Sequence, residues 1–264
     1  MASKAETRVP VCFDVLGTCF TFDRATQALL SVFPDLDEER ADSIIQDWFH
    51  SAQRDFTYLS INGDYQPIAK VLKHSLPRIY LMHHLVDPLH TSTTTSSHRP
   101  DDDVVVDVDA DLVDPVLAAL PTLSPRPSLA PCSRLLLLDR SSSESSKSSS
   151  TRFRLVAVTN GGLESTKNYF SAALGRDGAR RRREGEGAGG TNDEDDEEVV
   201  EGWSFVSCDE IGVAKPDPRV YDHVWSRLGQ PNNDDDRRSA TPRRREGWFV
   251  ASHSWDLHAA KKAG

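Results

Sequence analysis

Short apolar runs alternate with amphipathic stretches along most of the chain. Strand-like apolar runs occupy residues 9–13, 152–158, 205–207 and 248–251. Apolar positions recur at helical spacing over residues 23–33, 38–58, 68–81, 112–120 and 164–174. Strands that alternate with helices form parallel sheets covered by helices on both faces, so the pattern predicts an α/β fold with a Rossmann-like parallel sheet.

The first long helical block interrupts this alternation. Residues 23–90 contain helical patterns and no strand-like run. We therefore expect a small helical cap at 23–90, inserted after the first strand, and a core domain formed by residues 1–22 and 112–264.

Four polar stretches interrupt the pattern, at residues 91–111, 141–151, 176–202 and 230–246. Segments with so few apolar side chains bury too little surface to offset the entropy of ordering. They are expected to be low-complexity or disordered insertions, which a core tolerates because loop-closure entropy grows slowly with length.

Composition narrows the class of protein. The 264 residues carry a formal net charge of -10, which argues against nucleic-acid binding because a phosphate-tracking surface needs a clustered basic face. The sequence contains no run of about 18 apolar residues, the length needed to span a membrane, and its N-terminus lacks the apolar core of a signal peptide. The four cysteines form no CxxC pair, so neither a zinc site nor a redox pair is indicated. We expect a soluble, cytoplasmic protein.

Polar side chains follow the apolar strands in a distinctive order. Asp14 ends the first run, Thr159 and Asn160 follow the second, and Lys215 and Asp256 come after the later runs. Ligands of open α/β sheets bind beyond the carboxyl ends of the strands, so these side chains are placed for chemistry.

In this order of motifs the chain resembles the haloacid dehalogenase (HAD) superfamily, and within it the type II 2-haloacid dehalogenase-like branch. The resemblance implies a HAD-like core with a helical cap. It also implies a hydrolase that forms an aspartyl-ester covalent intermediate on a small anionic substrate. Because the fold normally continues with a further strand and helix after the helix that ends at Gly264, the C-terminal part of the core is expected to be truncated.

Chemistry suggests a role for each residue. Asp14 is the expected nucleophile, and Lys215 would keep its carboxylate ionised and balance substrate charge. Asp256 would orient Lys215, position the hydrolytic water or help to hold a metal. Thr159 and the backbone N–H groups of Asn160 and Gly161 would bind an anionic group at a helix start.

The resemblance adds further substrate-binding candidates. Tyr221, six residues after Lys215, corresponds to an active-site tyrosine of the dehalogenase branch, and Thr18 in the turn after Asp14 is assigned to the same site. His50 stands where that branch holds a substrate-binding arginine, and Arg54 one helical turn further on is a possible substitute.

Besides His50, three further positions depart from the pattern of the superfamily. Leu16 replaces the general acid that phosphatases carry two residues after the nucleophile, which favours a leaving group that needs no proton, such as halide. Ala251 and His253 replace a serine and an asparagine of the dehalogenase branch, and His253 could serve as a general base.

Two alternatives remain open at this point. A Mg-dependent phosphatase would use Asp14 and Asp256 as magnesium ligands, whereas dehalogenase-like chemistry would require no cofactor. A catalytically degenerate binding or regulatory protein is the other alternative. The expected partner is a small anionic substrate, without nucleic acid or membrane, and a homodimer is possible.

Overall fold

The computed structural model describes residues 8–87, 108–137, 152–183, 200, 202–228 and 246–264. The chain divides into two compact units. The first combines Met1–Phe20 with Pro125–Gly264, and the second is Thr21–Ser124. The chain passes between them at strands β2 (Phe20–Thr21) and β3 (Ser124–Pro125), which pair with each other.

The first unit is built on a parallel sheet of four strands. They are β1 (Arg8–Asp14), β4 (Arg152–Thr159), β5 (Trp203–Ser207) and β6 (Trp248–Val250). Their order across the sheet is β5-β4-β1-β6, and all neighbours are parallel. The predicted α/β fold and its four strands are confirmed.

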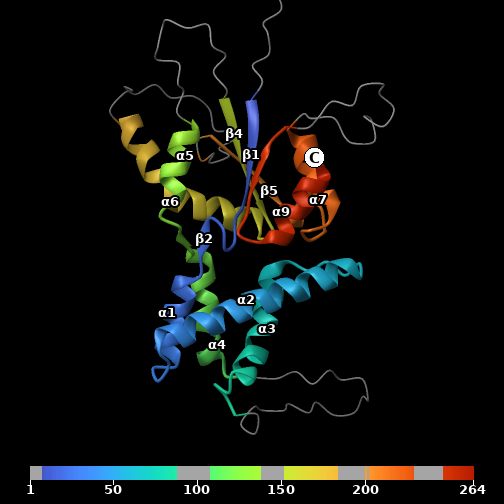
Figure 1. Ribbon diagram of the computed structural model, residues 1–264. Helices are drawn as coiled ribbons and strands as arrows, with labels where there is room; N and C mark the ends of the chain where they lie inside the picture. Colours follow the sequence, from blue (N-terminus) through green and yellow to red (C-terminus); the bar gives the residue numbers. More distant parts are fainter. Residues whose placement is uncertain (1–7, 88–107, 138–151, 184–199, 201, 229–245) are drawn as a thin grey trace, which may run out of the picture. The chain divides into compact units, whose positions relative to one another are not determined.

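Helices cover both faces of this sheet. They are α5 (Leu129–Leu137), α6 (Leu163–Arg183), α7 (Pro218–Arg227) and α9 (Ser254–Ala263). A short 3-10 turn, η2 (Cys208–Glu210), follows β5. Figure 1 shows α5 and α6 on one side of the strands and α7 and α9 on the other.

The two central strands, β1 and β4, are covered on both faces, which explains why their sequences are unbroken apolar runs. Val11, Cys12 and Phe13 of β1 are all buried, as are residues 155–158 of β4. Strands covered on both faces lose the alternation of apolar and polar positions. In register, Asp14 lies opposite Val158 and Phe13 opposite Val250. The carboxyl ends of the strands therefore meet at one edge.

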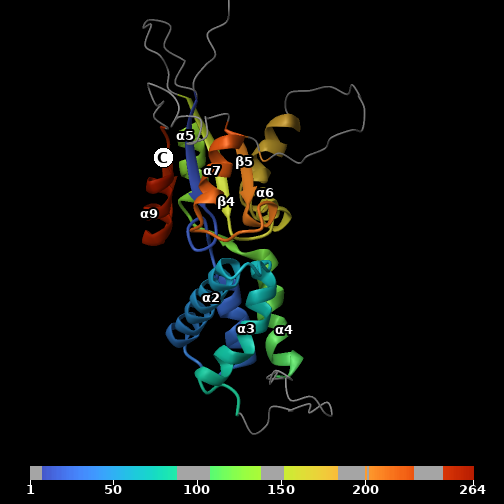
Figure 2. The ribbon, with the colours of Figure 1, turned by 90° about the vertical axis from the view of Figure 1, so that its right-hand side faces the viewer.

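Among its described residues, the second unit is helical apart from the short strands β2 and β3 at its two boundaries. Its helices are α1 (Asp23–Val32), α2 (Glu38–Ile61), α3 (Ile68–Met82), α4 (Ala110–Ala119) and the 3-10 turn η1 (Leu120–Thr122). α2 packs against α3, and α1 packs against α4; Figure 2 shows α2, α3 and α4 gathered together. A helical unit is thus inserted after the first core strand, as predicted.

The boundaries of this unit differ from the prediction. The segment from residue 112 was assigned to the core, but α4 belongs to the second unit. Val113 and Val116 are buried there, and the Tyr80 hydroxyl of α3 donates a hydrogen bond to the carbonyl of Leu112 at 3.0 Å. Amphipathic periodicity identified the helix but did not show which unit buries its apolar face.

The predicted insertions lie mostly outside the described residues. One part, 176–183, is described and is wrong as an insertion, because α6 continues to Arg183. Residues 110 and 111, from another predicted insertion, form the first turn of α4. None of the helices in the described part of the chain is long and apolar enough to cross a bilayer.

Candidate active site

Asp14 is the last residue of β1 and is 5% exposed. The chain turns immediately after it: the Gly17 N–H donates to the carbonyl of Phe20 at 2.9 Å. Gly17 has a φ of 82°, a conformation that side chains with a Cβ rarely adopt. This turn brings Thr18 back to the strand end, where its hydroxyl donates to Asp14 Oδ2 at 2.7 Å.

Lys215 lies between two carboxylates. Its Nζ is 2.5 Å from Asp14 Oδ1 and 2.8 Å from Asp256 Oδ2, and it also donates to the carbonyl of Val158 at 3.2 Å. The Lys215 and Asp256 side chains are fully buried. The structure therefore brings together the three residues that were predicted to be catalytic.

These contacts set the protonation states. Burial raises the pKa of Asp14, but the charge of Lys215 and polar contacts from His253, Lys215 and Thr18 outweigh burial and hold that pKa at about 2. Burial lowers the pKa of Lys215, but the charges of Asp14 and Asp256 raise it above the ordinary value. The site thus holds an ionised carboxylate beside a permanent ammonium at neutral pH.

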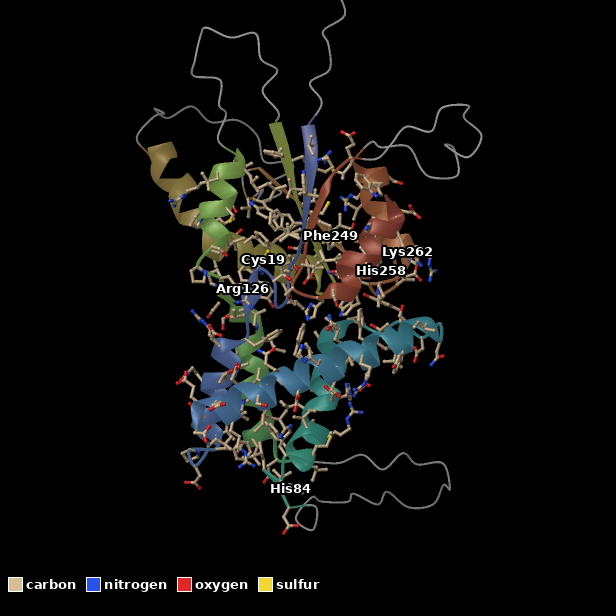
Figure 3. All side chains as sticks on the ribbon, viewed as in Figure 1. Cys19, His84, Arg126, Phe249, His258 and Lys262 are labelled. Carbon is tan, nitrogen blue, oxygen red and sulfur yellow. The ribbon has the colours of Figure 1, made fainter. Side chains whose placement is uncertain are left out.

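Tyr221 and Phe249 enclose this charged cluster. The Tyr221 hydroxyl, on α7, donates to Asp256 Oδ1. Phe249 of β6 places its ring 5.9 Å from Lys215 Nζ and 5.7 Å from the Tyr221 ring, and Figure 3 labels it beside the strands. Burial and the nearby Asp256 carboxylate raise the pKa of Tyr221, so the phenol stays protonated. Phe249 was not predicted as a site residue because an apolar side chain in a strand looks like ordinary core.

Asn160 fixes the backbone that carries Lys215. Its side-chain Oδ1 accepts from the Lys215 N–H at 3.0 Å and from Cys208 Sγ at 3.1 Å. Its Nδ2 is buried and has no hydrogen-bond partner among the described residues. A buried amide donor without a partner is costly, and a bound ligand oxygen would satisfy it.

The neighbouring Thr159 ends β4, and its predicted role in anion binding stays a prediction. Its side chain is fully buried, and its hydroxyl accepts from the Gly161 N–H at 2.8 Å. α6 begins only at Leu163. The Gly161 N–H predicted to bind an anion is therefore already used within the turn.

The loop after β6 reaches the turn at Thr18. The Ser252 N–H donates to the Thr18 hydroxyl at 2.8 Å, and His253 Nδ1 lies 3.8 Å from Asp14 Oδ2. Thr18 thus links the nucleophile candidate to the loop that carries His253. Ser252 was missed because an exposed serine in a polar loop gives no signal in the sequence.

His50 and Arg54 lie on α2 of the second unit, and both are exposed. The Arg54 guanidinium donates to Ser51 Oγ at 3.0 Å, and the His50 ring lies 5.8 Å from that of Phe49. Both residues belong to the second unit, and their predicted role in substrate binding stays a prediction.

The carboxylates do not fit a magnesium site. Asp14 accepts from Lys215 and Thr18, and Asp256 accepts from Lys215 and Tyr221. Each of the four carboxylate oxygens therefore has a protein donor, and an ammonium stands between the two groups. Among the described residues, no three His, Cys, Asp or Glu side chains are placed to hold a metal ion together.

Protein-family models and curated proteins gave no match to the sequence. Solved structures did match. The L-2-haloacid dehalogenase from Xanthobacter autotrophicus with chloropropionic acid covalently bound is 19% identical, with a TM-score of 0.61, over 98% of this chain and 75% of that chain. A second dehalogenase is 18% identical with a TM-score of 0.59, over 98% and 83%. Another L-2-haloacid dehalogenase is 17% identical with a TM-score of 0.60, over 98% and 84%.

At these identities the likeness concerns the fold, while the chemistry must be argued from the site. The similar structures are dehalogenases, and the match extends over nearly the whole chain. The parallel α/β core, with a helical unit inserted after its first strand, therefore has the haloacid dehalogenase fold.

Proposed function

We propose that this chain is a HAD-type hydrolase that opens its reaction with a nucleophilic attack by Asp14. The observation that carries the proposal is the pairing of a buried, ionised Asp14 with a fully buried Lys215 at the carboxyl edge of the sheet. A carboxylate that is ionised, dry and fixed by hydrogen bonds is a competent nucleophile.

The preferred reaction is the hydrolysis of a carbon–halogen bond in a small 2-haloacid. An Asp14 carboxylate oxygen attacks the carbon, a C–O bond forms, and the halide leaves with the electron pair of the broken bond. Water then attacks Cγ of the Asp14 ester, which releases the 2-hydroxy acid and a proton and regenerates the carboxylate.

The apolar side chain at position 16 favours a halide leaving group. Leu16 occupies the position of a phosphatase general acid and is buried. Thr18 and Tyr221 direct their hydroxyl protons toward Asp14 and Asp256. A halide departs without a proton, whereas an alkoxide needs one.

Attraction for an anionic substrate does not come from Lys215 alone. Its one positive charge faces two carboxylates, so the three groups together carry a negative charge. The donor that supports an anion is Asn160 Nδ2, which is buried without a partner. We assign it to the substrate carboxylate.

The test is halide release from L- and D-2-chloropropionate and haloacetates, with phosphate release from small phosphomonoesters measured in parallel. Halide release that persists in EDTA is expected, because the carboxylate oxygens are already engaged by protein donors. Asp14→Asn should abolish it. Asp111→Asn, which removes an exposed carboxylate on α4, is the matched control and should have no effect.

Other results would overturn the proposal. Phosphate release that stops on chelation would support the magnesium-dependent alternative. No turnover of any substrate by folded protein, or equal turnover by Asp14→Asn, would point to a binding or regulatory protein instead.

A further inference from the structure

His253 lies beside Asp14 Oδ2, the carboxylate oxygen that accepts a hydrogen bond from Thr18. Among the described residues, the Asp14 carboxylate has polar contacts with Thr18, Lys215 and His253. The 3.8 Å between His253 Nδ1 and Asp14 Oδ2 is too long for a direct hydrogen bond. It is the kind of separation that one water molecule can bridge.

The other groups of the cluster are poorly suited to remove a proton from water. Both Asp256 oxygens accept hydrogen bonds, from Lys215 and Tyr221, and the side chain is fully buried. Lys215 is held as an ammonium, and Tyr221 stays protonated. Asp256 therefore acts as a positioning residue for Lys215.

The imidazole of His253 is held in place by its own loop. Its ring stacks on Trp255, with centroids 5.4 Å apart and planes 26° apart, and Nδ1 lies 3.3 Å from Ser252 Oγ. The residue sits at the start of α9, where its carbonyl accepts from the N–H of Asp256. Its side chain keeps 16% of its surface exposed, so water can reach it.

We propose that His253 is the general base that activates the water which hydrolyses the Asp14 ester, an inference that rests on the proposed function. The imidazole takes one proton from the water as the water oxygen bonds to Cγ of Asp14. The ester C–O bond at Cγ then breaks, and the imidazolium returns the proton to the departing alkoxide. The remaining water proton leaves for solvent as the Asp14 carboxylate re-forms.

Both a charged group and neutral hydroxyls lie beside His253. Asp14, on β1, faces His253 with Oδ2, while its Oδ1 forms an ion pair with Lys215. Thr18 and Ser252, in the adjacent loops, have neutral hydroxyl groups. Formation of the ester removes the negative charge of Asp14 and leaves its carbonyl beside the imidazole. His253 therefore contributes to the second step, and the first step does not require it.

The experiment compares the wild type, His253→Ala and His253→Asn with 2-chloropropionate as the probe. Intact-protein mass spectrometry measures the ester on Asp14, and rapid quench measures halide release. In both variants we expect the first halide to be released at close to the wild-type rate. Ester hydrolysis should then slow about 100-fold or more, as expected for loss of a general base, so that the ester accumulates. Added imidazole should restore turnover of His253→Ala.

The outcomes separate the inference from the proposed function. His258→Ala, which removes an exposed histidine of α9 (Figure 3), is the matched control and should not accumulate ester. Wild-type turnover by both His253 variants without accumulated ester would overturn the role of His253 and leave Asp14 as nucleophile. A wild-type protein that neither releases halide nor carries an ester would overturn both. The smaller change to asparagine guards against a variant that fails to fold.

Discussion

Lys215 is a charged side chain that is fully buried in the site. Its fully buried ammonium contacts two carboxylates that would otherwise face each other in a dry environment. Removing one partner from a buried ion cluster leaves the remaining charges without compensation. The same contacts that prepare Asp14 for attack therefore also hold the carboxyl edge of the sheet together.

Lys215→Met should destabilise the protein by about 3–5 kcal/mol, because Asp14 and Asp256 then repel each other without a counter-charge. Chemical denaturation measures the loss. Adding Asp256→Asn to the variant removes one of the two like charges and should recover part of it. Equal stability of the single and double variants would contradict this description of the cluster.

The charged residues of the site could be predicted from the sequence more readily than its other residues. Asp14 ends an apolar run, and Lys215 and Asp256 follow later runs, so their meeting at one sheet edge could be predicted. Phe249 and Ser252 could not, since their roles depend on contacts made across the fold with Lys215 and Thr18. The partners of Asn160 are likewise set by where Cys208 and Lys215 come to lie.

At the scale of elements, the strands and most helices follow from hydrophobic periodicity, and the errors have physical causes. α5 was not predicted, because Pro125, Pro127 and Pro131 stand before the helix and in its first turn, where they obscure a helical pattern. Proline is tolerated in a first turn, where its missing N–H has no helical partner. α6 extends beyond its predicted end to Arg183, over a stretch whose polar composition had assigned it to an insertion.

The entry to β6 depends on a close approach that only glycine permits. A Cβ on Gly247 would lie 2.9 Å from the Trp225 ring and 3.1 Å from the carbonyl of Pro10. Gly247→Ala should therefore cost about 1–3 kcal/mol through overpacking, measured as a lower free energy of unfolding. Gly175→Ala on α6 is the matched control, because a Cβ there meets nothing within 4 Å and alanine favours a helix. If both variants were equally stable, β6 would not be packed as described.

At the scale of the whole molecule, the acid stability of the protein depends on the charged cluster. The pKa of Asp14 is about 2 in the folded chain and 3.8 without these contacts. A depressed carboxyl pKa stabilises the folded state above pH 3.8, and this contribution is lost as pH falls through 2. The raised pKa of Lys215 contributes fully below its ordinary value of 10.5 and is lost only as pH rises through the higher folded value.

The free energy of unfolding of the wild type should therefore fall between pH 4 and pH 2. Asp14→Asn, which removes the titrating group, should show a shallower fall over the same range. Denaturant titrations at a series of pH values measure both. Parallel curves for the two proteins would show that Asp14 is not the depressed carboxyl.

The sequence predicted the division of the chain into two units, but placed the far boundary of the second unit too early. The absence of strands between residues 23 and 90 indicated a helical insertion, but its far boundary depends on tertiary packing. α4 is amphipathic and would suit either unit; its buried Val116 and the hydrogen bond from Tyr80 to the Leu112 carbonyl place it with the inserted helices.

Isotope labelling can show whether Asp14 forms a covalent ester during turnover. A single turnover of 2-chloropropionate in ¹⁸O-labelled water, followed by mass spectrometry of the peptide that contains Asp14, locates the oxygen taken from water. We predict that ¹⁸O enters the Asp14 carboxylate and that the first product molecule carries unlabelled oxygen. Label found directly in the product, with Asp14 unlabelled, would contradict the nucleophilic role of Asp14.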